Sequence, residues 1–125
     1  MNLHDAIEIA VATRYLEDQS EPDNERYAFA YTIRIHNRGD VAARLLTRYW
    51  LIVDALGFPQ EVRGFGVVGE QPMLKPGDTF EYTSGAVLHT DCGTMQGHYG
   101  MQGEDGTQFE VPIPQFTLSM TRTLH

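Results

Sequence analysis

The feature that most constrains this chain is a two-residue alternation of apolar and polar side chains, interrupted at short intervals by glycine and proline. The clearest example is the apolar face of the segment 28–36, formed by Phe29, Tyr31, Ile33 and Ile35. A period of two is typical of a half-buried β-strand, because successive side chains point to opposite faces of a sheet. No window of eleven residues shows a helical period. The pattern therefore predicts an all-β fold.

Other segments alternate in the same way between turn residues. The segment 43–54 is apolar on both faces, which is typical of a central strand. Strict alternation puts Leu45, Leu51 and Val53 on one of its faces and Leu46, Trp50 and Ile52 on the other. We expect Trp50, Leu51 and Val53 to be mostly buried. Further strands are expected at 7–11, 61–63, 79–85, 93–102 and 108–121, and seven or eight such strands predict an antiparallel β-sandwich.

Turn chemistry separates these strands. The segments 36–40 and 74–78 are predicted turns, since they combine glycine with asparagine or proline. Pro112 and Pro114 mark the last strand as an edge strand, or as one that switches between sheets, because proline cannot donate to a ladder. The acidic, polar segment 19–26 is expected to be a mobile surface connection.

Charge and length limit the classes of function. The 125 residues carry a net charge of −8, which disfavours nucleic acid and anionic membranes as partners, since both are bound mainly through basic side chains. The longest apolar run, 49–53, is far too short to cross a bilayer. The one cysteine requires no oxidising compartment, and the first residues do not resemble a signal peptide. We expect a single domain over residues 1–125, in the cytoplasm.

The segment Gly64–Gly69, "GFGVVG", has the spacing G-x-G-x-x-G of dinucleotide-binding turns. In those proteins the glycines lead into a helix whose N-terminus holds the pyrophosphate, and an acidic residue follows about 20 positions later. Here Pro72 and Pro76 would break such a helix, and residues 88–90 contain no acid. The motif therefore favours structural glycines at a bulge or a crossing between sheets. Two alternatives stay open: a backbone nest for a small anion, and an apolar patch of Phe65, Val67 and Val68.

Three other groups of residues are candidates for chemistry. His89, Asp91 and Cys92 are types found in thiol and metal sites, but their spacing favours a polar loop between strands. Glu104 and Asp105 precede a glycine, which is typical of a hairpin turn. Arg48 is expected to be a structural hydrogen-bond anchor for a carboxylate or for carbonyl groups, and not a substrate clamp. We predict no catalytic residue, no cofactor and no bound metal.

Five stretches together resemble the bacterial ApaG family, also called CorD, over nearly the whole chain. They are "RYAFAYTIRIHNRGD", "LLTRYWLIVDALG", "EVRGFGVVGEQPMLKPGDTFEYTSG", "GTMQGHYGM" and "FEVPIPQFTL". Tyr49 departs from the pattern, which has His there, and His89 and Cys92 stand where the family usually has neither. The resemblance implies a fibronectin-type-III-like or immunoglobulin-like sandwich with no established enzyme activity.

The resemblance also implies two kinds of function. The same module occurs in a eukaryotic F-box protein and in a polymerase-delta-interacting protein, where it resembles a protein-binding domain. In bacteria the family is linked to cobalt and magnesium tolerance, and its gene commonly neighbours those of a diadenosine-tetraphosphate hydrolase and an rRNA methyltransferase. We therefore expect a small non-enzymatic module that binds an unknown protein. The alternative is a binder of a nucleotide, dinucleoside polyphosphate or pyrophosphate. For both, the candidate binding loop consists of Gly64, Phe65, Gly66, Val67, Val68, Gly69 and Glu70.

Overall fold

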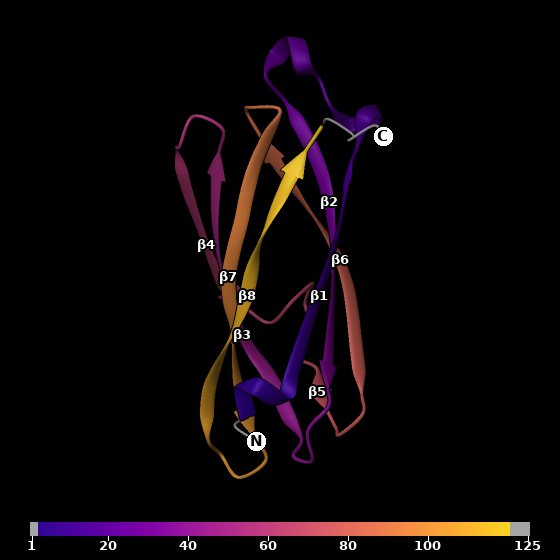
Figure 1. Cartoon of the computed structure of the whole chain (residues 1–125), viewed down its shortest axis with the longest axis vertical. Coiled ribbons are helices and arrows are strands. Elements are labelled where there is room, and N and C mark those ends of the chain that lie inside the picture. The colour runs from indigo at the N-terminus through magenta and orange to yellow at the C-terminus, as the bar shows by residue number, and fades with distance from the viewer. Residues whose placement is uncertain (1–2, 121–125) are drawn as a thin grey trace.

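The structure, a computed structural model, describes residues 3–120 and forms two antiparallel β-sheets that pack face to face (Figure 1). One sheet has the strand order β1-β2-β6. The other has five strands, with β4-β3-β7-β8 in a row and β5 also paired with β3. The strands are β1 (Ile7–Tyr15), β2 (Tyr27–Asn37), β3 (Ala43–Asp54), β4 (Pro59–Phe65), β5 (Met73–Leu74), β6 (Thr79–Leu88), β7 (Cys92–Gly103) and β8 (Gln108–Ser119). The predicted all-β sandwich is confirmed; Thr121, at the end of the predicted last strand, lies outside the described residues.

Strand β2 supplies the centre of the core in the way its sequence predicts. The apolar side chains of Phe29, Tyr31, Ile33 and Ile35 are all buried, and they pack between the two sheets. Arg34, which alternates with them, is exposed on the outer face. β2 is the central strand of its sheet, between β1 and β6, and its apolar face packs against the opposite sheet, which explains its regular alternation.

Strand β3 departs from the predicted alternation. Its pairing with β7 shifts register between Leu45 and Thr47, as a β-bulge does. The extra residue turns the following side chains over, so Leu45 and Trp50 both face the core although five positions separate them. Ile52 is buried with them. Leu51 and Val53, predicted to be mostly buried, are only partly buried on the outer face and do not belong to the core.

Strand β8 is an edge strand, as its prolines predict. Among the described residues it pairs with β7 alone, and the register shifts between Met95 and Gly97 of β7, where Pro114 and Gln115 of β8 have no directly paired residue. On the inner side β8 lies beside β1, which closes one side of the sandwich (Figure 1). The predicted loop 19–26 is exposed but not irregular throughout, since it contains the short 3₁₀ turn η3 (Pro22–Asn24) just after η2 (Glu17–Gln19). Its predicted mobility stays a prediction.

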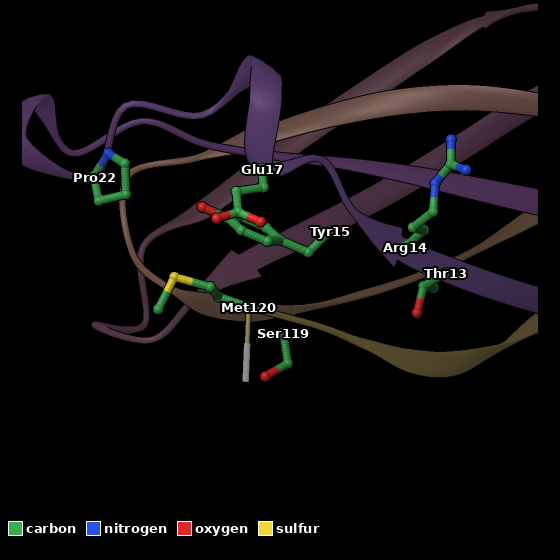
Figure 2. Close-up of a pocket in the computed structure, with 7 residues that line it drawn as sticks. All are labelled: Thr13, Arg14, Tyr15, Glu17, Pro22, Ser119 and Met120. Carbon is green, nitrogen blue, oxygen red and sulfur yellow. The ribbon is translucent and has the colours of Figure 1, made fainter. Parts of the chain in front are cut away.

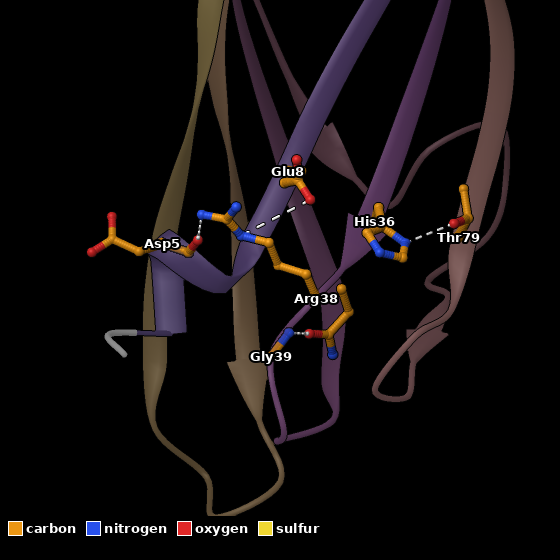
Figure 3. A network of polar contacts seen from close by, with 7 residues as sticks. Asp5, Glu8, His36, Arg38, Gly39 and Thr79 are labelled. Carbon is orange, nitrogen blue, oxygen red and sulfur yellow. Dashed lines mark hydrogen bonds and ion pairs between the residues drawn. The ribbon is translucent and has the colours of Figure 1, made fainter.

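A polar network holds the end of the sandwich where η1 (Leu3–Ala6) precedes β1 (Figure 3). Arg38 donates to the carbonyl of Asp5 at 3.3 Å and lies 3.9 Å from the carboxylate of Glu8. Beneath it, the fully buried Asn37 side chain donates to the carbonyls of Val41 and Leu74 and accepts the N–H of Gly39. Each buried polar atom of this amide therefore has a partner, which ties two loops to β2.

Candidate functional site

The glycine motif forms a tight chain reversal after β4. The N–H of Val67 donates to the carbonyl of Glu70 at 2.8 Å, and the N–H of Glu70 donates back at 2.9 Å. The two residues between them have positive φ, 43° at Val68 and 81° at Gly69. A pair of left-handed residues inside reciprocal hydrogen bonds is the geometry of a type I′ turn. The chain therefore reverses within two residues, and β5 follows in place of a helix.

Each glycine of the motif has its own conformational reason. Gly66 has a φ of 64°, and a Cβ there would collide with the carbonyl oxygen of Glu70. Gly69 is left-handed in open space, so only its φ favours glycine. At Gly64 a Cβ would lie 2.6 Å from Nη1 of Arg48, so this glycine leaves room for the guanidinium.

Arg48 of β3 anchors the start of the loop. Its Nη1 donates to the carbonyls of Phe65 and Gly66, at 3.1 and 3.0 Å. The loop is also held by backbone and side-chain bonds to Leu46, whose carbonyl accepts the N–H of Gly66 at 2.8 Å and Nε2 of Gln71 at 2.9 Å. Arg48 is thus a structural hydrogen-bond anchor, and of the two predicted kinds of acceptor, carboxylate or carbonyl, the structure shows carbonyls.

Several of the hydrogen-bond donors on this loop are engaged within the chain. The N–H groups of Gly66, Val67 and Glu70 all donate to carbonyls. The strongest nearby cation, Arg48, also points Nη1 at carbonyls, and the exposed Glu70 adds a negative charge to the turn. A phosphate that used these donors would displace internal hydrogen bonds and approach a carboxylate, and both changes cost free energy.

The side chains of the loop divide between the core and the solvent. Phe65 is 81% exposed and Val68 is 55% exposed, whereas Val67 is only 1% exposed and packs in the core. The prediction that Val67 belongs to an apolar surface patch is therefore wrong. Val67 points inward, and Phe65 and Val68 are the outward apolar side chains of the loop.

Val68 holds an unfavourable backbone conformation. Positive φ places Cβ against the following carbonyl and costs an L-residue roughly 1–2 kcal/mol, and a β-branched residue is a marked outlier there. Asn, Asp or Gly is the usual residue at this position of a type I′ turn. A valine directly before the turn glycine is unusual in sequence, but its strain can be inferred only once the turn is known to be of type I′.

Comparison with known proteins places the chain in a family. Residues 17–103 match the family model of the ApaG domain. The chain belongs to the ApaG domain family. It is 60% identical over 120 residues to Protein ApaG of Stenotrophomonas maltophilia, covering 96% of this chain and 94% of that protein. Protein ApaG of Thiobacillus denitrificans is also 60% identical, over 95% of this chain and 94% of that one.

Solved structures of relatives have the same fold. The crystal structure of the putative ApaA protein from Bordetella pertussis superposes with a TM-score of 0.91 at 52% identity, covering 94% of this chain and 95% of that one. An X-ray structure of a structural-genomics target gives a TM-score of 0.92 at 48% identity, over 99% and 94% of the two chains. The family resemblance and the sandwich fold expected from the sequence are thus both confirmed.

The other candidate groups of this ApaG-domain chain take structural positions. Nδ1 of His89 lies 3.3 Å from the carbonyl of Glu25, and burial, with a hydrogen bond to Asp91, raises the pKa of the Cys92 thiol. Asp105 accepts the N–H of Thr107 at 3.0 Å, and this hydrogen bond lowers the pKa of its carboxyl group. Within residues 3–120 no three His, Cys, Asp or Glu side chains gather in a way that would hold a metal ion.

Sequence reasoning missed a row of stacked side chains on the outer face of the five-stranded sheet. The guanidinium of Arg63 lies 4.4 Å from the ring centroid of Tyr49, and the Tyr49 and His98 rings stack at 5.0 Å. Nε2 of His98 lies 2.9 Å from the carboxylate of Glu110, and the Tyr49 hydroxyl donates to Glu61 at 2.7 Å. These residues come from four strands, so only the strand register brings them together. Tyr49 is the centre of this row.

An open hollow of about 890 Å³ lies where β1 and η2 meet the end of β8 (Figure 2). It is lined by Thr13, Arg14, Tyr15, Glu17, Pro22, Ser119 and Met120. None of the predicted site residues lies there. Met120 is the last described residue, so we assign no site to this hollow. Among the described helical segments, none is long and apolar enough to span a membrane.

Proposed function

We propose that this ApaG-domain chain is a small non-enzymatic module that binds a partner protein through the loop Gly64–Glu70, with Phe65 and Val68 as its anchors. The observation that carries the proposal is the conformation of Val68, a β-branched residue at a φ of 43° whose side chain is mostly exposed. Asn or Gly would form the same turn without strain. Strain of this kind persists in proteins mainly where the residue serves a function.

The chemistry of the two side chains supports a protein as the partner. An aromatic ring that is 81% exposed beside an exposed valine loses contact with water when a partner covers it. Aromatic and aliphatic anchors in the centre of an interface carry most of its binding energy. The hydrogen bonds from Arg48 and Leu46 hold the loop backbone in place, so little conformational entropy is lost on binding.

Features outside the loop bear on the class of partner, on catalysis and on localisation. The net charge of −8 favours neither nucleic acid nor an anionic membrane as the partner. The raised pKa of Cys92 disfavours a nucleophilic thiolate, and the carboxylate of Asp105 is engaged by its own turn. We place the protein in the cytoplasm, and we propose that the link to cobalt and magnesium tolerance runs through the partner.

Photo-crosslinking tests this function. A benzophenone amino acid replaces Phe65 in one variant and Leu56, which is 73% exposed in the β3–β4 turn, in a matched control. In extract of the source cells, we expect position 65 to give one saturable crosslinked protein and position 56 to give none. Excess unlabelled wild type should compete, whereas the double variant Phe65→Ala, Val68→Ser should not. Competition by ATP, diadenosine tetraphosphate or pyrophosphate would instead favour the metabolite alternative.

A further inference from the structure

A groove runs between the free edges of β4 and β6, on the side of the sandwich opposite the β1–β8 contact. It consists of two adjoining hollows of about 320 and 160 Å³, which share Ile52, Gln60 and Val87. Tyr31 and Trp50 form its apolar floor together with Ile52. One end reaches Arg48, beside the glycine loop, and the other reaches the exposed ring of Phe58. We call this surface the β4–β6 groove.

The edge of β6 offers backbone hydrogen-bonding groups to this groove. β6 pairs only with β2 among the described residues. The N–H and carbonyl of Asn37 bond to Asp78 and Gly77, so the odd-numbered residues of β2 point their backbone groups at β6. Their partners in β6 are even-numbered, for example Ala86 opposite Phe29. The backbone groups of Gly85 and Val87 therefore point outward, since alternate residues of a strand face opposite neighbours.

The edges of the two sheets differ in how they are protected against strand addition. Proteins usually block an exposed edge with proline, charge or a bulge. β8 has Pro112, Pro114 and a register shift. β6 has no proline, and Glu81 is its only charged residue. The half of β6 that lines the groove, Ser84–Val87, has small or apolar side chains and leaves its edge open.

Two polar groups at the groove lack partners. Nε and Nη2 of Arg48 donate to no group among the described residues, and no described carboxylate forms an ion pair with its guanidinium. The indole Nε1 of Trp50 is buried without an acceptor. An arginine that has no ion-pair partner among the described residues complements a carboxylate of a ligand.

We propose that the β4–β6 groove receives an extended, acidic segment of a partner protein. The segment adds to the edge of β6 through the backbone of Gly85 and Val87, places a carboxylate on Arg48, and lays an apolar side chain over Trp50 and Ile52. Strand addition supplies affinity through main-chain hydrogen bonds, and the pockets beside the strand supply specificity. The inference rests on the proposed protein-binding function but uses a surface separate from Phe65 and Val68.

Selection from a phage-displayed library of random nine-residue peptides tests the groove with the full chain as bait. We expect the enriched peptides to combine an acidic residue with apolar residues at alternate positions. In ¹⁵N spectra, a synthetic peptide of this kind should shift the amides of Gly85 and Val87 and the indole N–H of Trp50. Val87→Pro removes one outward N–H and should weaken binding roughly tenfold, whereas the matched Val87→Thr keeps the N–H and should bind within about threefold.

A second pair of variants tests the charge. Arg48→Lys keeps the positive charge and should retain more affinity for the acidic peptide than Arg48→Met, with thermal unfolding confirming that both variants fold. Failure to enrich any peptide, or equal binding by Val87→Pro and Val87→Thr, overturns the groove. If pyrophosphate alone shifts the indole N–H resonance of Trp50, the groove binds a small anion and the proposal of a peptide ligand is overturned. If Phe65→Ala abolishes peptide binding and Val87→Pro does not, the proposal of a binding groove is overturned, whereas the proposed function of the glycine loop is not.

Discussion

Gly66→Ala tests the claim that the glycine motif is a structural turn. A residue with a Cβ at a φ of 64° costs roughly 1 kcal/mol. The new Cβ would also collide with the carbonyl oxygen of Glu70, which accepts the N–H of Val67. Relieving that collision weakens the two hydrogen bonds of the Val67–Glu70 pair, worth about 1 kcal/mol each. Alanine also lowers the conformational entropy of the unfolded chain, and this offsets about 0.5 kcal/mol of the lost stability. The expected net loss of stability is about 2–3 kcal/mol.

Urea unfolding, followed by the fluorescence of Trp50, measures this loss, and Gly69→Ala is the matched control. Gly69 has a φ of 81° but no atom within 4 Å of the position that a Cβ would take, so it keeps only the conformational cost of about 1 kcal/mol. We expect Gly66→Ala to lower the unfolding midpoint at least twice as far as Gly69→Ala. Equal losses in the two variants would refute the close approach between Gly66 and Glu70 as the reason for this glycine.

Four further predictions concern other parts of the chain. Val68→Asn should raise the free energy of unfolding by about 1 kcal/mol, because Asn tolerates positive φ, and should weaken partner crosslinking; an unchanged crosslink would contradict the role of the side chain. Asn37→Ala should cost about 3 kcal/mol in urea unfolding, since it removes the three hydrogen bonds of a fully buried side-chain amide. Burial raises the pKa of Tyr82 and Tyr99 above the ordinary value of 10.0, so thermal stability should fall as pH rises above 10, where the unfolded state loses these protons first; a flat profile would argue against burial. Cys92 should react with iodoacetamide at pH 7 more slowly than a cysteine in a short model peptide, because its raised pKa keeps it a thiol.

The sequence predicts what depends on local periodicity. The buried face of β2 and the edge position of β8 follow from alternation and from proline chemistry, because each reports on its own strand. The bulge near Leu45 cannot be predicted in this way, because one extra residue in an apolar segment does not change the local sequence pattern. It nevertheless reverses which face of the sheet the following side chains point to. Leu51 and Val53 were misplaced for this reason.

The candidate loop was found from the sequence only in part. The glycine spacing located the turn, and the prolines after it excluded a nucleotide-binding helix. The opposite directions of Val67 and Val68 depend on the turn type, which neighbouring valines do not reveal. The stacked row around Tyr49 and the β4–β6 groove depend on register and on the packing of two sheets, so they required the structure.

The affinity of the crosslinked partner for matched variants is the measurement that tests protein binding through Phe65 and Val68 most directly. The partner identified from position 65 is purified and titrated calorimetrically into the wild type and into the double variant Phe65→Ala, Val68→Ser, with the fold of each verified by ¹⁵N spectra. Loss of two exposed apolar anchors should cost about 2 kcal/mol or more, so we expect affinity to fall at least about 30-fold. Equal affinities for the two proteins, or saturable binding of ATP or pyrophosphate confined to the amides of Gly64–Glu70, would contradict protein binding through this loop.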